Sequence, residues 1–193
     1  MNKLTAADLW KLEDYARERP AFRTRVLAHK QARTIHLGAH LTLVFEDRIT
    51  VQYQVQEMLR IERIFEAAGI VDELAAYNPL IPDGSNLKAT LLIEYDDVDV
   101  RRRELERLRG IEHDIRLVVD GHPPIVAIAD EDLPRSDDEK TAAVHFLRFE
   151  LDAAAVAGFG RGANALFRIE HANYRAEARL NEAQQKALAA DFD

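Results

Sequence analysis

The strongest constraint on the fold is a break at residues 78–85, where two different hydrophobic patterns meet. Before it, apolar residues mostly recur every three or four positions, as on one face of an α-helix. After it, short apolar runs alternate with turn residues, as in β-strands. The break contains Pro79, Pro82 and Gly84, and proline fixes φ whereas glycine accepts positive φ. This segregation of helices and strands predicts an α+β fold.

The first half of the chain is predicted to be mainly helical. Helices are expected at about residues 5–17 and 20–32, because Pro20 would interrupt one helix or start the next. A long helix is expected at about 48–68, since apolar residues at helical spacing continue up to Gly69, a typical helix terminator. The remaining elements are a short strand at 41–45 and a short helix at 70–77.

The second half is predicted to form a mainly antiparallel sheet. Strands are expected at 89–95, 115–119, 125–129, 141–151 and 166–171, and helices at 97–109, 153–157 and 181–190. A hairpin turn is expected at 120–124, and the acidic residues 130–139 are expected to form an exposed loop. We therefore expect a single domain over residues 1–193, in which N-terminal helices (about 1–78) pack on a sheet from the C-terminal half (about 86–193).

Composition excludes several classes of function. The chain has no cysteine, which excludes disulfides, iron–sulfur ligation, thiolate metal ligands and a catalytic thiol. The formal net charge of -8 repels nucleic acid and anionic lipid. The basic clusters at 17–33 and 101–109 are interpreted as exposed faces of helices. No secretion signal is evident, and no apolar run approaches the ~20 residues that span a bilayer. We expect a cytoplasmic protein that binds neither nucleic acid nor membrane.

The predicted long helix carries an unusual polar stripe. Its members follow one another at helical spacings and are Tyr53, Gln56, Glu57, Arg60 and Arg63. Tyrosine, glutamine and arginine make directional hydrogen bonds, and arginine binds carboxylates with two parallel bonds, so the stripe is expected to hold a ligand or a partner. The alternative is a solvent-exposed face on which Glu57 pairs with Arg60.

A second candidate site is the segment 170–175, which follows an apolar strand. His171, Tyr174 and Arg175 could move protons or bind an anion, and strand ends often carry functional residues. Because adjacent strand residues point to opposite faces, Glu170 and His171 act together only if the strand stops there. The alternative is a strand end with surface polar groups. Asn78, in the central break, is a further candidate for ligand or partner binding.

The spacing of the seven histidines does not predict a metal site. His36 and His40 are four residues apart, but Gly38 indicates extended or turned structure, in which the two side chains would lie ~13 Å apart. The segment 158–163 matches a dinucleotide motif by letter but follows a helical pattern instead of a strand. No metal and no cofactor are therefore predicted. Three other histidines are interpreted as structural: His113, His122 and His145.

Several stretches resemble an uncharacterised bacterial family, a domain of unknown function of about this length. They are residues 4–8, 45–48, 56–60, 77–82 and 171–177, and together they span nearly the whole chain. The resemblance implies a free-standing domain whose gene often neighbours those of a rubrerythrin-like protein and an iron–sulfur oxidoreductase subunit. It thereby implies a redox protein partner and a link to peroxide stress, but no catalytic residue.

The leading hypothesis is a cytoplasmic accessory protein that binds a redox protein or a small anionic ligand through the polar stripe and the 78–84 loop. The alternative is a small enzyme in which Glu57 or His171 is the general acid–base and an arginine, Arg60 or Arg175, binds an anionic substrate. The enzyme is favoured if the two segments meet in one pocket, whereas the accessory protein is favoured if the stripe lies on a flat or partner-covered face. Homo-oligomerisation is left open.

Overall fold

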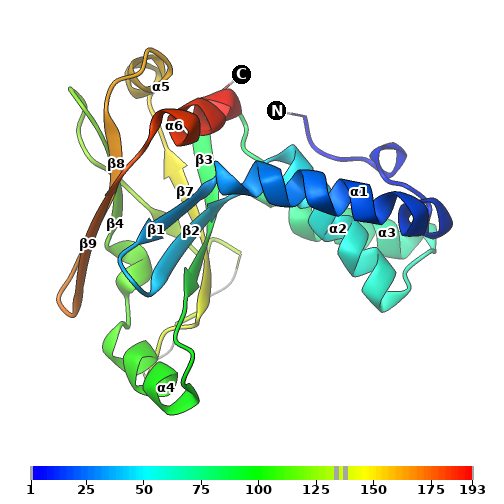
Figure 1. Ribbon diagram of the computed structural model, residues 1–193, viewed down its shortest axis with the longest axis horizontal. Coiled ribbons are helices and arrows are strands. Elements are labelled where there is room, and N and C mark those ends of the chain that lie inside the picture. Colours follow the sequence, from blue (N-terminus) through cyan, green and yellow to red (C-terminus); the bar gives the residue numbers. More distant parts are fainter. Residues whose placement is uncertain (1, 133–134, 137–138, 193) are drawn as a thin grey trace.

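The computed structural model describes residues 2–132, 135–136 and 139–192, and it has the α+β architecture predicted from the sequence (Figure 1). Two antiparallel sheets are present in this part of the chain. The first has the order β1 (Thr34–Leu37), β2 (Leu41–Phe45), β3 (Asn86–Ile93), β7 (Val144–Glu150) and β6 (Ile128–Ala129). The second has the order β5 (Ile125–Val126), β4 (Ile115–Val119), β8 (Ala165–His171) and β9 (Tyr174–Arg179).

The main hydrophobic core is formed by residues of both sheets. Side chains alternate along β7, so that Leu147 and Phe149 are buried while Phe146 and Arg148 are only partly covered. The ring of Phe149 meets that of Phe167 from the second sheet, with centroids 5.2 Å apart. Aromatic contacts of this kind bury large apolar areas and join the two sheets.

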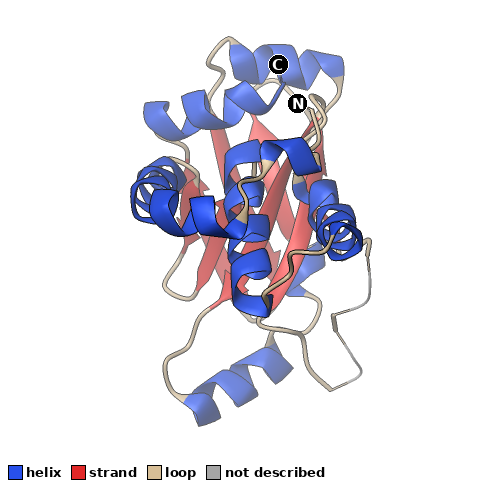
Figure 2. Ribbon diagram, turned by 90° about the vertical axis from the view of Figure 1, so that its right-hand side faces the viewer, coloured by secondary structure: helices blue, strands red, loops and turns tan. Residues whose placement is uncertain are grey.

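Three helices form an arm that projects from the sheets, and we call them the helical arm (Figures 1 and 2). They are α1 (Leu12–Gln31), α2 (Arg48–Glu62) and α3 (Ala67–Tyr77). The arm has its own small core, formed by Leu4, Val51, Val55, Leu59, Leu74 and Ile81. An aromatic cluster beside it comprises Tyr15 and Phe22, with Trp10 and Tyr53 packed against them.

The shorter helices lie at the two ends of the sheets. In Figure 1, α5 and α6 lie at the upper end and α4 at the lower end. Their bounds are α4 (Val98–Arg107), α5 (Ala153–Gly160) and α6 (Glu182–Ala189), and the 3₁₀ turns are η1 (Ala6–Asp8), η2 (Asn78–Leu80), η3 (Ile111–His113) and η4 (Ala190–Phe192). Among the described residues, no helix has the length and apolarity needed to cross a membrane.

Three predicted helix boundaries are wrong. The first helix does not begin at residue 5, because Ala6–Asp8 form the 3₁₀ turn η1 and α1 begins at Leu12. Pro20 lies inside α1 instead of dividing two helices, because Tyr15 before it and Phe22 after it are both buried in one aromatic cluster. That packing outweighs the cost of a proline in a helix, about 3 kcal/mol. The long helix ends at Glu62 instead of 68, because Arg63 adopts a left-handed conformation (φ 55°) and the Ile64 N–H donates to the Leu59 carbonyl.

Two strand predictions also need correction. The segment 125–129 is not one strand: β5 pairs with β4 of the second sheet, whereas β6 pairs with β7 of the first. Ala127 between them is buried and donates its N–H to Ile115, so the chain crosses from one sheet to the other there. The strand β9 was not predicted, because after Tyr174 its half-buried face carries only Ala176 and Ala178, and alanine is a weak strand former.

Gly38 is required in the β1–β2 turn. It has φ 74°, and a Cβ there would clash with the Tyr174 hydroxyl, whereas Gly110 has φ 85° with open space around it. We expect Gly110→Ala to lower the free energy of unfolding by about 1–2 kcal/mol for the left-handed backbone alone. Gly38→Ala should cost about 1–3 kcal/mol more, because the clash is added. Urea unfolding of both variants measures this difference, and equal losses would contradict it.

Candidate functional site

Glu57, the centre of the predicted stripe, is held by a dense set of hydrogen bonds. Arg19 donates to both carboxylate oxygens, at 2.7 and 2.8 Å, and the Tyr15 hydroxyl donates to Oε1 at 2.7 Å. Arg60 lies further away, at 3.3–3.4 Å. The Arg19 hydrogen bonds are the main reason that the pKa of Glu57 is lowered to about 2. A carboxylate with so low a pKa is a poor general base near neutral pH.

We expect Glu57→Gln to lower the free energy of unfolding by about 1–2 kcal/mol, because charge-assisted hydrogen bonds from Arg19 and Tyr15 would be weakened in a partly exposed site. Since the pKa of Glu57 is lowered from 4.5 to about 2, its contribution is present above pH 4.5 and is lost as the pH falls towards 2. Urea unfolding at pH 7 and pH 3 measures both effects. Glu62→Gln, on the exposed end of the same helix, should stay within about 0.5 kcal/mol of the wild type.

Other predicted binding residues hold the N-terminal segment against the arm. The buried amide of Gln56 accepts from the Trp10 N–H at 2.6 Å and donates to the Trp10 carbonyl at 3.4 Å. Asn78 does the same with Leu4, at 2.8 and 3.0 Å. Tyr53 packs edge-on against the aromatic cluster of the arm. Two members of the stripe, Arg60 and Arg63, lie exposed at its outer end.

The segment 170–175 forms the tight β8–β9 connection. His171 is 8% exposed, and its Nε2 lies 3.2 Å from the Arg109 carbonyl while its Nδ1 accepts from the Asn173 N–H at 3.2 Å. These partners fit the tautomer with its proton on Nε2. Tyr174 donates to the Leu37 carbonyl at 2.6 Å, joining the two sheets, and Arg175 is exposed.

The structure does not bring the two predicted segments together. The stripe lies on the helical arm, whereas the β8–β9 connection lies on the opposite side of the molecule (Figure 1). Within the described chain, the hydrogen bonds of Glu57 and those of His171 have no partner in common. The convergence that would favour the enzyme hypothesis is therefore not observed for these residues.

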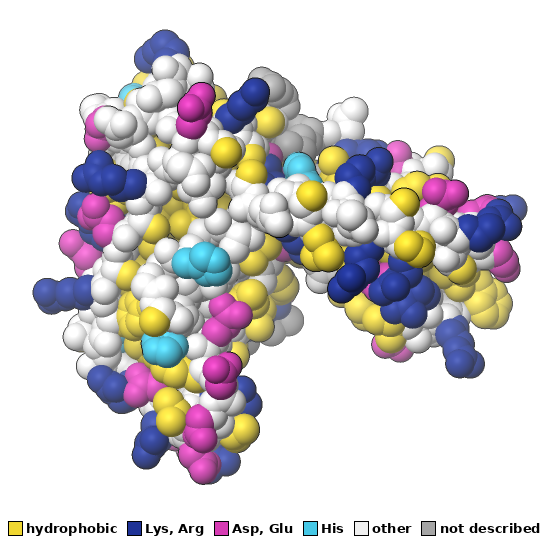
Figure 3. Space-filling model, in the orientation of Figure 1, with side chains coloured by type: hydrophobic (Ala, Val, Ile, Leu, Met, Phe, Trp, Pro, Cys, Tyr) yellow, Lys and Arg dark blue, Asp and Glu magenta, His cyan; other side chains and the backbone are white. Residues whose placement is uncertain are grey.

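The outer end of the helical arm exposes a group of large apolar side chains. Near the α2–α3 junction, Ile61, Phe65 and Val71 are 57%, 71% and 59% exposed. Beside them is a groove of about 390 Å³. Its lining comprises Trp10, Lys11, Leu12, Glu13, Leu59, Ile64, Phe65 and Ile70. We call this surface the arm tip, and Figure 3 shows hydrophobic side chains there beside basic ones. Apolar patches of this kind often mark interaction sites.

A smaller cavity of about 150 Å³ lies between η2 and the first sheet. Apolar side chains, including Tyr77, Leu80 and Phe146, form much of its wall. Its two cations are already engaged: Lys88 donates to the Pro79 carbonyl, and Arg148 binds the carboxylates of Glu131 and Glu150. Burial also lowers the pKa of Lys88. A ligand there would contact mainly apolar surface.

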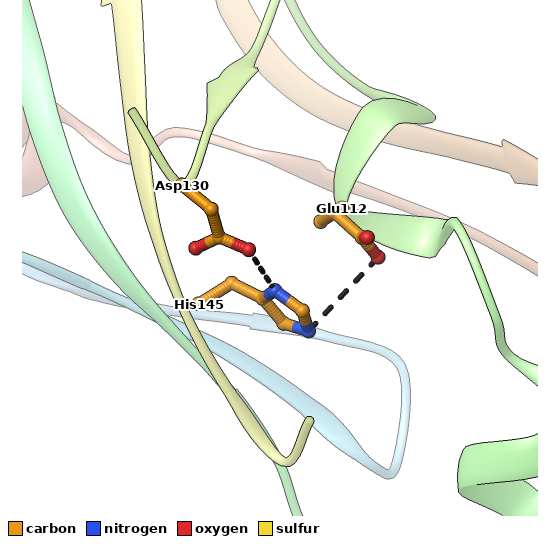
Figure 4. Close-up of side chains that lie close together, drawn as sticks. All are labelled: Glu112, Asp130 and His145. Atoms are coloured by element: carbon orange, nitrogen blue, oxygen red, sulfur yellow. Dashed lines mark hydrogen bonds and ion pairs between the residues drawn. The ribbon is translucent and has the colours of Figure 1, made fainter. Parts of the chain in front are cut away.

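A third feature is a buried centre of two carboxylates and one imidazole, which comprises Glu112, Asp130 and His145 (Figure 4). Glu112 lies in η3, Asp130 directly follows β6, and His145 lies near the start of β7. One donor atom from each residue can be chosen so that all three lie within 4.8 Å of one another. Asp130 Oδ2 lies 2.6 Å from His145 Nδ1, and Glu112 Oε2 lies 3.9 Å from Nε2.

Hydroxyl groups complete the surroundings of Glu112. Ser136 donates to Oε1 at 2.5 Å, and Thr141 lies 3.2 Å from Oε2 and 2.8 Å from His145 Nε2. Burial favours a raised pKa, but the Ser136 hydrogen bond and the nearby histidines outweigh it, so the pKa of Glu112 is lowered. Glu112 is therefore ionised, and its carboxylate accepts hydrogen bonds in a position from which water is almost excluded.

This centre was not predicted from the sequence, where His145 was interpreted as a structural histidine. Its residues come from three distant segments, and none of the metal-binding spacings searched for connects them. The one local signal is the alternation along β7, which places the polar His145 on the same buried face as Leu147 and Phe149. A polar residue at such a position needs buried partners, and sequence alone does not identify them.

Comparisons with known proteins give a family and a close structural match. Residues 3–192 match the model of a family described as a protein of unknown function (DUF3501). A crystal structure at 1.90 Å resolution, described as a novel protein of unknown function from Burkholderia pseudomallei K96243, is 50% identical with a TM-score of 0.95. The match covers 100% of both chains. No curated protein matches the sequence.

Proposed function

We propose that this chain, which belongs to the DUF3501 family of proteins of unknown function, is an accessory protein that binds a partner protein through its arm tip. The observation that carries the proposal is the 71% exposure of Phe65 beside an apolar groove. Aromatic side chains supply much of the binding energy at protein interfaces when a partner buries them. An exposed phenylalanine flanked by Ile61 and Val71 is such an anchor.

The outer end of the polar stripe supports the same surface. Arg60 and Arg63 are exposed on the last turn of α2 and just after it, next to groove residues Leu59 and Ile64. Arginine is enriched at interfaces because its planar guanidinium binds carboxylates and also covers apolar surface. In this proposal the inner residues of the stripe stabilise the arm, and the two arginines contact the partner.

A redox protein is the partner that we propose, and we place the interaction in the cytoplasm. The resemblance to a family whose genes neighbour those of redox proteins supports this choice. Lys11 of the groove wall, together with the exposed Arg60 and Arg63, would favour a partner with carboxylates around an apolar patch, because complementary charges orient two proteins during encounter. Glu13 of the same wall would favour a cation at one point of that partner's surface. A narrower version of this proposal is that the same arginines bind a small anionic ligand.

The test is site-specific photo-crosslinking in the native host. A photoreactive phenylalanine analogue is placed at position 65 and, as a matched control, at position 98, where Val98 of α4 is 59% exposed far from the arm. We expect one specific protein adduct from position 65 and none from position 98. Equal labelling from both positions would contradict the proposal.

A second variant measures the strength of the contact. Phe65→Ser removes the exposed ring without disturbing a buried core, so the fold should be retained. If Phe65 is an anchor worth about 2 kcal/mol, the dissociation constant for the crosslinked partner should rise about 30-fold. Val98→Ser is the matched control and should leave it unchanged.

A further inference from the structure

The buried centre near the start of β7 contains two carboxylates, and neighbouring groups must balance their negative charge. His145 is completely buried, Glu112 is 2% exposed, and the Asp130 side chain is 8% exposed. Two carboxylates removed from water in one place are costly unless positive charge lies between or beside them. Arg135 Nη1 lies 3.4 Å from Asp130 Oδ1 and partly balances that carboxylate, and the imidazole ring lies between the two acids, so the species bound at its nitrogens sets the remaining charge (Figure 4).

Asp130 is placed as the orienting partner of a metal-binding histidine. Its Oδ2 lies 2.6 Å from His145 Nδ1, while its Oδ1 accepts the Phe146 N–H at 3.0 Å, so the carboxylate is fixed from both sides. Histidines that bind metal through one ring nitrogen almost always donate the other N–H to a carboxylate, a carbonyl or water. This contact leaves Nε2 as the nitrogen available to an ion.

Oxygen atoms surround that second nitrogen. Glu112 Oε2 lies 3.9 Å from Nε2, the Thr141 hydroxyl lies 2.8 Å away, and the Ala142 carbonyl lies 3.0 Å away. The distance to Glu112 is too long for a hydrogen bond. It is close to the separation of two donors on one ion, since metal–ligand bonds of about 2.0–2.2 Å in a tetrahedral arrangement place the donors about 3.4 Å apart.

We infer that the buried centre is a binding site for a divalent first-row transition-metal ion, with His145 Nε2 and Glu112 as ligands and Asp130 as the positioning residue. A nitrogen with carboxylate and hydroxyl oxygens suits Mn²⁺, Fe²⁺ or Zn²⁺. Mg²⁺ and Ca²⁺ bind oxygen donors almost exclusively and are disfavoured by the imidazole. The site is independent of the arm tip, so either proposal can fail without the other.

The competing explanation uses the same residues without an ion. If Nε2 carries a proton, its N–H donates to the Thr141 hydroxyl or to the Ala142 carbonyl. The centre would then be a structural ion-pair network that fixes the start of β7. The two explanations differ in one property. A metal site takes up one ion per chain and loses it when either ligand is changed, whereas a proton-filled network takes up none.

The experiment is metal binding to the purified full chain after treatment with a chelator. Calorimetry and elemental analysis with Zn²⁺, Mn²⁺ and anaerobic Fe²⁺ should each be compared with Mg²⁺. We expect one equivalent of at least one transition metal. His145→Gln and Glu112→Gln should each weaken it more than about 100-fold, and Asp130→Asn by about 10–100-fold. His36→Gln, at an exposed histidine of β1, is the matched control and should bind normally.

A measurement on the wild-type chain removes any dependence on the folding of the variants. With Mn²⁺ bound, pulsed electron paramagnetic resonance detects coupling to a directly bound histidine nitrogen. Such coupling, together with the variant series, supports the site. Absence of bound transition metal, absence of nitrogen coupling, or unchanged affinity in a folded His145→Gln variant would each overturn the inference.

Discussion

Replacing Arg33 by methionine is expected to lower the free energy of unfolding by about 3–5 kcal/mol, the usual cost of removing one partner from a buried ion pair. Arg33 is 1% exposed, and all three nitrogens of its guanidinium donate hydrogen bonds. Nε donates to the Phe45 carbonyl, and Nη1 donates to the Ala187 carbonyl. Nη2 donates both to the Glu46 carbonyl and to the Asp191 carboxylate, the latter at 2.5 Å. One side chain thus joins β2, α6 and the C-terminal turn η4.

The loss of stability arises because removal of the arginine leaves buried carboxylates without their positively charged partner. Asp191 is completely buried, and the carboxylate of Asp47 lies 3.6 Å from Arg33 Nε, so both would lose their nearest guanidinium. Methionine fills a similar volume and therefore tests charge and hydrogen bonding more than packing. Arg17→Met is the matched control, because the Arg17 side chain is 73% exposed, and it should change stability by less than about 0.5 kcal/mol.

Urea unfolding of the two single variants and of a double variant separates the contributions. In Arg33→Met with Asp191→Asn, no uncompensated carboxylate remains at position 191. The double variant should therefore lose less stability than the sum of the two single losses, by about 1–3 kcal/mol. A loss below about 1 kcal/mol in Arg33→Met alone would show that the cluster contributes little to holding the C-terminal turn.

The hydrophobic pattern sufficed to predict the fold class, but not the places where tertiary contacts outweigh local preference. The helix at Pro20 continues because aromatic packing on both sides outweighs the proline. The end of α2 at Arg63 depends on a left-handed arginine, a conformation that the sequence does not signal. Strand β9 was missed although Tyr174, Ala176 and Ala178 alternate with charged residues, because alanine is depleted in strands and gives only a weak signal.

The candidate sites show a different limit of sequence reasoning. Four of the five stripe residues lie on α2 and Arg63 follows its end, but whether each one faces a ligand depends on segments far away in the chain. Gln56 accepts a hydrogen bond from the Trp10 N–H, and Glu57 accepts one from Arg19 of α1. The buried centre combines residues from three segments, and only the pairing of β6 with β7 brings Asp130 to His145.

The same C-terminal cluster should give the stability of the protein an unusual dependence on pH. Burial raises the pKa of Asp191 from 3.8 to about 6, although Arg33 opposes this shift. Its Oδ1 atom has no hydrogen-bond partner among the described residues, which fits a carboxyl group that burial keeps from ionising easily. The other charged groups that act on it are Asp47, which raises its pKa, and His29, which lowers it.

The direction of the effect follows from the raised pKa. A carboxyl group that binds its proton more tightly in the folded state contributes its full stabilisation below pH 3.8, and this contribution is lost as the pH rises to about 6. A shift of about two pKa units corresponds to about 3 kcal/mol. Glu57, with its pKa lowered to about 2, acts in the opposite direction and mainly below pH 4.5. The two contributions therefore change over different pH ranges and in opposite directions.

The measurement is the free energy of unfolding in urea at intervals from pH 3 to pH 8, for the wild type and for Asp191→Asn. We expect wild-type stability to fall by up to about 3 kcal/mol between pH 4 and pH 7, and this fall to be absent from Asp191→Asn, which has no proton to release at that position. The readout is the difference in slope, so any constant loss caused by the amide does not affect it. Parallel curves for the two proteins would show that Asp191 is ionised in the folded state throughout this range, and that Arg33 outweighs the burial of the carboxylate.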